Sequence, residues 1–215
     1  MTSRAVLFDF DGTFADTAPD LAAAVNAMRT KRGLEPLPPA TVRPYASMGA
    51  RGLLRIGFGM TPEHSQYIAM RDEFLDRYAR ALCVDTRLFP GMPEVIDELG
   101  ARGIAWGIVT NKATRFTERL VRDLGVAPAC VVCGDSTPHL KPHPAPLLLA
   151  AKRLELAPRE CVYVGDDLRD IQAAHAAGMR SVAVEYGYHG ADNPGPATWN
   201  ADAIISHPSE LLEHL

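Results

Sequence analysis

Short apolar runs recur along the chain, and most of them contain no alternating polar residues. Runs of this kind are typical of parallel strands that are covered by helices on both faces of a sheet. The pattern predicts strands at residues 5–10, 104–110, 130–134, 161–165 and 181–184, with a weaker sixth at 203–206.

Helical spacing fills the gaps between these runs from Gly91 onward. The pattern predicts helices at residues 92–102, 113–124, 145–154 and 168–177. Plausible helix stops follow, such as Gly103, Gly125 and Gly178. The alternation of strand and helix favours an α/β fold with a doubly wound, Rossmann-like parallel sheet.

The stretch from about residue 18 to residue 87 interrupts this alternation. Its pattern predicts one helix after another, at residues 19–32, 41–47, 50–58 and 62–82. We interpret residues 16–87 as an all-helical cap domain inserted into an α/β catalytic core that comprises residues 1–15 and 88–215. A block inserted directly after the first strand is expected to sit over the carboxyl edge of the sheet.

Composition narrows the classes of partner. The 215 residues carry a formal net charge of −4 without a long basic run, so nucleic acid is not expected as a partner. The first residues lack the apolar segment of a secretory signal, and nothing approaches the ~20 continuous apolar residues that span a bilayer. We therefore expect a soluble, cytoplasmic protein with no membrane partner.

The chain contains four cysteines. Cys130 and Cys133 have a spacing found in metal sites, but they flank two valines in a predicted strand. Side chains three positions apart on a strand point to opposite faces, so this pair is not expected to share one ion. Buried, reduced thiols are the expectation for all four.

The first candidate for chemistry lies at the end of the first predicted strand, where Asp9, Asp11, Gly12 and Thr13 occur together. Strand alternation places Asp9 and Asp11 on the same side, and two such carboxylates repel unless a proton or a cation lies between them. Gly12 permits a sharp reversal of the chain, and Thr13 offers a hydroxyl and an amide to an anion. The alternative is a strand that simply leads into an acidic turn.

A second acidic group, formed by Asp166, Asp167 and Asp170, follows the predicted strand at 161–165. The carboxyl ends of parallel strands are where open α/β sheets bind ligands. Asp166 and Asp170 lie one helical turn apart if the helix begins here, so both can face one point. Oxygen ligands of this kind suit Mg²⁺. The alternative is helix capping, a role that fits Asp167 in particular.

Two further strand ends carry groups suited to phosphate. Thr110, Asn111 and Lys112 offer a hydroxyl, an amide and a cation at the end of the second strand of the core, although Thr and Asn are also common helix caps. Lys141 lies in a proline-rich loop after the third strand, where a fixed ammonium can neutralise a carboxylate and a phosphoryl group. The alternative for Lys141 is a solvated surface lysine.

Together these strand ends resemble the four motifs of the haloacid dehalogenase superfamily. Asp9, Asp11, Gly12 and Thr13 match the first motif, Thr110 the second, Lys141 the third, and Asp166 and Asp170 the acidic fourth. The resemblance implies that Asp9 is the nucleophile of an aspartyl-phosphate mechanism and Asp11 the general acid and base. It also implies Mg²⁺ held by Asp9, the Asp11 backbone carbonyl and Asp166, with Asp170 behind them orienting waters or Lys141.

Several stretches, including the one at residues 16–21, also resemble two related groups of phosphatases, which act on phosphoglycolate and on N-acetylmuramic acid 6-phosphate. The resemblance implies a small phosphate ester as partner, with 2-phosphoglycolate as the first choice and the amino-sugar phosphate as the alternative. We hypothesise that Arg51 binds a substrate carboxylate, against the alternative of a surface arginine at a helix start. A phosphosugar mutase and a non-catalytic phosphate-binding regulator are the rival functions. The oligomeric state stays open.

Overall fold

The computed structural model describes residues 3–189 and 194–215. Its centre is a parallel sheet of six strands in the order β5-β4-β1-β6-β7-β8. The strands are β1 (Ala5–Phe8), β4 (Ala105–Val109), β5 (Cys130–Val132), β6 (Cys161–Gly165), β7 (Arg180–Val184) and β8 (Ala203–Ile205). All six predicted strands are therefore confirmed, and the predicted α/β fold class is correct.

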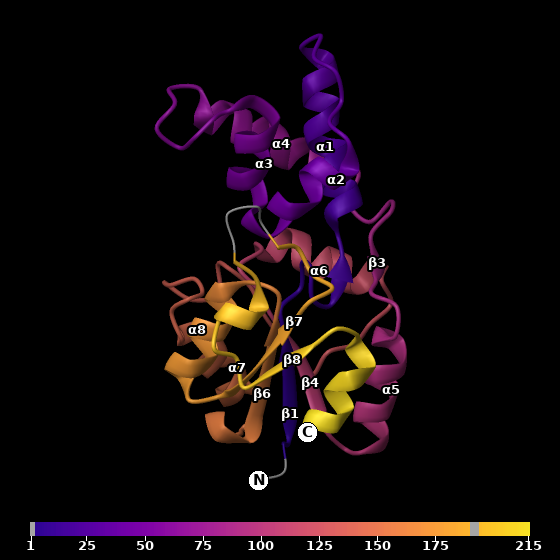
Figure 1. Ribbon diagram of the computed structural model, residues 1–215, viewed down its shortest axis with the longest axis vertical. Helices are drawn as coiled ribbons and strands as arrows, with labels where there is room; N and C mark the ends of the chain where they lie inside the picture. Colours follow the sequence, from indigo (N-terminus) through magenta and orange to yellow (C-terminus); the bar gives the residue numbers. More distant parts are fainter. Residues whose placement is uncertain (1–2, 190–193) are drawn as a thin grey trace.

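Alternation along β1 divides the core between the two faces of this sheet. Val6 and Phe8 belong to a cluster that includes α5 (Met92–Ala101) and α6 (Thr114–Asp123). Ala5 and Leu7 point to the other face, toward α7 (Ala145–Arg153) and α8 (Leu168–Ala177). Figure 1 shows α5 on one side of the sheet and α7 and α8 on the other. This arrangement is the doubly wound one.

A block of helices lies beyond the carboxyl edge of the sheet (Figure 1). It consists of α1 (Ala18–Lys31), α2 (Pro39–Val42), the 3₁₀ helix η1 (Arg43–Met48), α3 (Gly49–Phe58) and α4 (Tyr67–Arg80). The remaining 3₁₀ helices are η2 (Pro158–Glu160), η3 (Pro196–Thr198) and η4 (Pro208–His214).

The predicted helix at residues 62–82 is wrong in its first turn, because α4 begins only at Tyr67. The His64 amide donates to the Thr61 carbonyl at 3.0 Å, and the Gln66 amide donates to the His64 ring at 3.1 Å. These local turn bonds use the groups that a longer helix would need.

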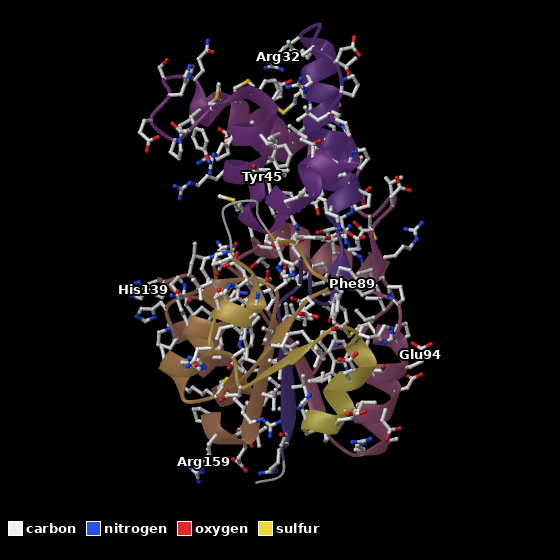
Figure 2. The ribbon with its side chains drawn as sticks, in the orientation of Figure 1. Arg32, Tyr45, Phe89, Glu94, His139 and Arg159 are labelled. Atoms are coloured by element: carbon white, nitrogen blue, oxygen red, sulfur yellow. The ribbon has the colours of Figure 1, made fainter. Side chains whose placement is uncertain are left out.

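Two very short strands, which the apolar pattern does not predict, lie where the chain leaves the core and returns to it. β2 (Ala15–Asp16) pairs antiparallel with β3 (Arg87–Leu88). Phe89 lies directly after β3 (Figure 2). Its ring is buried and lies 4.9 Å from the ring of Tyr186. Two-residue strands have no apolar period of their own, so only the pairing reveals them.

Two properties of the chain as a whole follow. Within residues 3–189 and 194–215, no helix has both the length and the apolar character needed to cross a bilayer. The four cysteines are free thiols, and Cys130, Cys133 and Cys161 are buried.

Phe14 provides a test of how the first loop is held against the sheet. Its ring is fully buried, stacks on Trp106 at 5.3 Å and contacts Phe8 at 5.7 Å. We expect Phe14→Ala to lower the free energy of unfolding by about 3–5 kcal/mol, because the aromatic contacts are lost and a cavity remains. Urea denaturation followed by circular dichroism measures this. Ile68→Ala, at a side chain 56% exposed, is the control and should change stability by less than about 0.5 kcal/mol.

Candidate active site

The site lies where the strand order of the sheet reverses. From β1 the chain moves outward through β4 and β5, and then returns to β6 on the other side of β1. The carboxyl ends of β1 and β6 therefore flank the position at which open α/β sheets bind ligands. Asp9 follows β1, and Asp166 follows β6.

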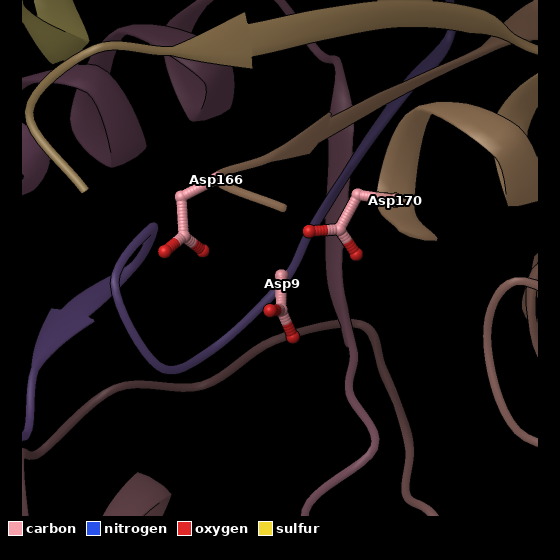
Figure 3. A group of neighbouring side chains, drawn as sticks. All are labelled: Asp9, Asp166 and Asp170. Carbon is pink, nitrogen blue, oxygen red and sulfur yellow. The ribbon is translucent and has the colours of Figure 1, made fainter. Parts of the chain in front are cut away.

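Three buried carboxylates meet at this point. Asp9, Asp166 and Asp170 each present an oxygen, and these oxygens all lie within 4.8 Å of one another. Figure 3 shows the three side chains converging from the β1 end, the β6 end and the first turn of α8. The structure thus brings together acidic residues that lie more than 150 positions apart in the sequence.

Lys141 is the cation at the centre of this group. Its ammonium lies 2.8 Å from Asp9 Oδ1 and 2.7 Å from Asp170 Oδ1, and its side chain is only 3% exposed. Burial alone would lower the pKa of Lys141, but the charges of Asp170 and Asp9 outweigh it, so the pKa is raised. Lys141 is therefore a buried, charged group and not a solvated surface lysine.

The loop that carries Lys141 is held by Asn111. The Asn111 side chain donates to the Lys141 carbonyl at 3.0 Å and accepts from the Lys141 amide at 2.9 Å. Its amide group is therefore used on the protein backbone, whereas the sequence suggested that it would bind phosphate. Thr110 is buried and lines the cavity described below, and its hydroxyl accepts from the Lys112 amide at 3.2 Å.

Asp166 is fully buried and accepts three hydrogen bonds. Its donors are the Thr13 hydroxyl at 2.9 Å, the Ser47 hydroxyl at 2.8 Å and the Tyr188 amide at 2.9 Å. The Thr13 hydroxyl, which the sequence suggested would be offered to an anion, therefore donates to a carboxylate of the protein itself. Ser47 and Tyr188 were missed, because nothing in their local sequence marks them as partners of Asp166.

Two glycines allow the chain to pack directly against Asp166. Gly12 has a φ of +86°, and a Cβ there would lie 2.2 Å from Asp166 Oδ2. A Cβ on Gly187 would lie 2.2 Å from the Asp166 Cβ and 2.7 Å from the Gly12 carbonyl oxygen. Both positions therefore exclude any side chain.

Asp11 has a different cation from Asp9. Its carboxylate accepts from Lys112 Nζ at 2.9 Å and from the Thr17 hydroxyl. The sequence predicts Asp9 and Asp11 on the same side of the strand, with a proton or a cation between them. β1 ends at Phe8, however, so neither carboxylate follows the strand alternation. Both still line the same cavity.

This cavity has a volume of about 590 Å³ and lies between the carboxylates and the helical block. Asp9, Asp11 and Lys141 line its inner end, and residues of η1 and α4 line its outer end. Arg51 is exposed and is not among the lining residues, although its neighbour Ala50 is. One residue along a helix turns the side chain by ~100°, so α3 directs Arg51 away.

Residues 6–184, which are more than half of the chain, match the model of the haloacid dehalogenase-like hydrolases. The chain belongs to this family.

Relatives extend the match over the whole chain. An N-acetylmuramic acid 6-phosphate phosphatase of Pseudomonas putida is 45% identical over 98% of this chain and 95% of its own length. A phosphoglycolate phosphatase of Xanthomonas campestris is 44% identical with the same coverage. A crystal structure of a predicted phosphoglycolate phosphatase from Haemophilus somnus, 28% identical, has a TM-score of 0.86 and covers 100% of this chain and 98% of that one. This hydrolase is a phosphatase of the family.

The charge of the site fits a divalent cation. Asp11 is paired with Lys112, and Asp167 with Arg169 at 2.8 Å, so neither pair adds net charge. Asp9, Asp166 and Asp170 face Lys141 alone, which leaves two negative charges without a counterion. Burial, followed by the charges of Asp9 and Asp170, raises the pKa of Asp166 well above its usual range.

The three acids differ in how much of their acceptor capacity is already used. Asp170 accepts from Lys141, from the Tyr163 hydroxyl and from the Asp167 amide, so it supports its neighbours. Asp167 accepts from the Arg169 amide at the start of α8, which is the capping role that its sequence suggested. Asp9 Oδ1 is buried and, although Lys141 is close, no donor meets it with hydrogen-bond geometry. Asp166 also accepts three hydrogen bonds, so Asp9 has the most acceptor capacity left among these acids.

The packing around Asp166 predicts the effect of a single methyl group. Gly187→Ala should destabilise the protein by about 1–3 kcal/mol and reduce phosphatase activity at least tenfold, because Asp166 must move to admit the Cβ. Denaturation curves and phosphate release measure the two effects. Gly100→Ala in α5, where a Cβ meets nothing within 4 Å, is the control and should be neutral or stabilising by up to about 1 kcal/mol. Equal effects of the two variants would refute this account.

The buried acids also predict a dependence on pH. Burial raises the pKa of Asp170 to about 6, whereas an unfolded Asp titrates near ~3.9. Between these values the folded protein binds more protons than the unfolded chain, so stability should fall as the pH rises from about 4 to about 6. The raised pKa of Asp166 extends this loss above pH 6.

Urea denaturation of the metal-free protein at a series of pH values measures this slope. Asp166→Asn should flatten it, and saturating Mg²⁺ should restore stability near neutral pH, by about 2.7 kcal/mol at a hundredfold excess over Kd. Glu73, whose pKa is lowered to about 2 mainly by Arg32, acts in the opposite direction and is unaffected by the substitution. A slope that is the same in wild type and Asp166→Asn would contradict the prediction.

Proposed function

We propose that this phosphatase is a Mg²⁺-dependent phosphomonoester hydrolase that uses Asp9 as its nucleophile. The observation that carries the proposal is the position of Asp9, whose buried oxygen lies 2.8 Å from the Lys141 ammonium at the point where the strand order reverses. A carboxylate held at this point with acceptor capacity to spare is suited to attack on phosphorus.

The residues that would hold the metal are Asp9, Asp166 and the backbone carbonyl of Asp11. All three lie at the carboxyl ends of β1 and β6, and oxygen-only donors of this kind suit Mg²⁺. Mg²⁺ bound there would neutralise charge on the phosphoryl oxygens. Asp170, through its 2.7 Å ion pair, would keep Lys141 charged and in place.

In the first step the Asp9 carboxylate attacks phosphorus and the bond from phosphorus to the ester oxygen breaks. Asp11 protonates the departing alkoxide, which gives an alcohol and an aspartyl phosphate on Asp9. In the second step Asp11 takes a proton from water, which attacks the phosphorus and releases inorganic phosphate and free Asp9. Lys141 stabilises the negative charge in both steps.

The helical block, residues 16–87, is proposed to act as a cap that excludes water from these steps. Its η1 helix reaches the core through the Ser47 hydroxyl on Asp166 and through the Ser47 carbonyl, which accepts from Arg169 at 3.0 Å. The paired strands β2 and β3 are the two chain crossings about which such a cap would move. Water exclusion strengthens the electrostatic terms at Asp9.

The names of the relatives support a small phosphate ester that carries a carboxylate as the substrate. One group of relatives carries the name of phosphoglycolate phosphatase and another that of N-acetylmuramic acid 6-phosphate phosphatase, at nearly equal identity. Both named substrates contain a carboxylate. Release of inorganic phosphate without a bisphosphate activator distinguishes this function from a mutase.

Substitution of the two acids tests the mechanism. Asp9→Asn should abolish phosphate release while the protein remains folded, because an amide is a poor nucleophile. Asp11→Asn should lose at least the ~10²-fold that is typical of general acid–base catalysis. Steady-state phosphate release with Mg²⁺ and circular dichroism measure activity and fold. Asp123→Asn, at an exposed pair with Arg119, is the matched control. Wild-type turnover by Asp9→Asn would rule out the assignment.

A further inference from the structure

The outer half of the cavity is too apolar and too large for a phosphate group alone. The outer half is the part lined by Leu21, Phe74, Leu75, Tyr78, Phe116, Arg71 and Arg115. The rings of Phe74 and Tyr78 are parallel to within 6° at 6.3 Å, and Phe116 lies 5.4 Å from Tyr78. Together α1, α4 and α6 form an aromatic and aliphatic wall opposite the carboxylates.

Two arginines face this outer half from different elements. Arg71 on α4 forms an ion pair with the carboxylate of its neighbour Asp72 at 2.8 Å, and the two side chains are 41% and 56% exposed. Arg115 on α6 lies with its guanidinium carbon 4.5 Å from the centre of the Phe116 ring. Among the residues that the structure describes, no carboxylate lies within ion-pair distance of Arg115, and none of its N–H groups has a hydrogen-bond acceptor within 3.5 Å.

A guanidinium stacked on a ring keeps its N–H groups available in its plane, where they match a carboxylate in bidentate geometry. Arg115 is therefore a charged group that is oriented by Phe116 and lacks a protein anion. Its place on the lining makes a substrate anion the natural partner.

A buried hydroxyl points to a ligand independently. Tyr78 is only 1% exposed and lines the cavity. Among the described residues, no group meets its hydroxyl with hydrogen-bond geometry, although the Lys112 ammonium, 4.7 Å from its ring centre, is close enough for its charge to lower the Tyr78 pKa against the larger effect of burial. A buried hydroxyl without a partner is costly, so a ligand acceptor would satisfy it.

The volume of the cavity distinguishes between the two substrates that the names of the relatives suggest. A cavity of about 590 Å³ lies within the ~300–1,000 Å³ of sites that enclose drug-sized ligands, whereas a two-carbon acid phosphate would leave the aromatic wall uncovered. The apolar face of a sugar ring packs well on aromatic side chains.

We propose that the outer half of the cavity binds the organic part of a hexose-sized phosphate ester that bears a carboxylate, with Arg115 as the main carboxylate-binding residue. Arg71 assists from α4, and the Tyr78 hydroxyl donates to an oxygen of the sugar substituents. The inference rests on the proposed phosphatase function and reverses the substrate order suggested by the sequence, in which 2-phosphoglycolate came first and Arg51 held the carboxylate.

Paired esters test this inference. N-acetylmuramic acid 6-phosphate and N-acetylglucosamine 6-phosphate share one ring, and only the first carries a carboxylate. Wild-type kcat/KM should favour the carboxylated ester by about tenfold to a hundredfold, as expected for a charge-assisted hydrogen-bonded pair. Arg115→Gln should bring that ratio close to one through a rise in KM for the carboxylated ester. Arg115→Lys, which keeps the charge without the planar fork, should retain part of the preference.

Arg122→Gln is the control, because Arg122 lies on the same helix, has a side chain 73% exposed and does not line the cavity. It should leave the ratio at its wild-type value. Arg71→Gln, on α4, should also lower the ratio of the two kcat/KM values, but by a smaller factor than Arg115→Gln.

Different results would overturn the proposed phosphatase function and the proposed role of Arg115. Absence of phosphate release from every ester, including p-nitrophenyl phosphate, would overturn the proposed function and this inference with it. An active enzyme that prefers 2-phosphoglycolate over both hexose esters, or an Arg115→Gln protein that keeps the wild-type ratio, would overturn this inference alone.

Discussion

The structure depends on three carboxylates that are buried against a single ammonium. Asp9, Asp166 and Asp170 converge within 4.8 Å, and Lys141 compensates only one of their charges. Like charges this close are unfavourable in a buried site, so the arrangement persists only because the surrounding fold holds it. When all three are ionised, the two residual negative charges match the charge of a single divalent cation.

The surrounding fold holds these charges through backbone packing more than through other charges. Adjacent parallel strands β1 and β6 place Asp9 and Asp166 side by side, and the absence of side chains at Gly12 and Gly187 lets two loops close directly on Asp166. Asn111 fixes the Lys141 loop through its backbone. Gly12 adopts a φ of +86° readily because it has no Cβ, whereas any other residue would be strained there and would collide with Asp166.

The two ends of the cavity are built from different kinds of element. Its inner end is built from strand ends, which are rigid and suited to the phosphoryl group, while its outer half is built from helices α1, α4 and α6. Ser47 joins the two parts, because it belongs to η1 and yet donates to Asp166.

The apolar runs predicted all six strands of the main sheet, since burial on both faces leaves a local signal in the sequence, and the acids after β1 and β6 marked the site because strand ends meet at one edge. Only the tertiary structure decided which groups face them. Thr13 donates to Asp166, Asn111 holds a loop, Ser47 and Tyr188 join the site from distant segments, and Arg51 points away. Strand periodicity is a local property of the chain, whereas the partner of a buried polar group is set by packing between segments far apart, which no local pattern encodes.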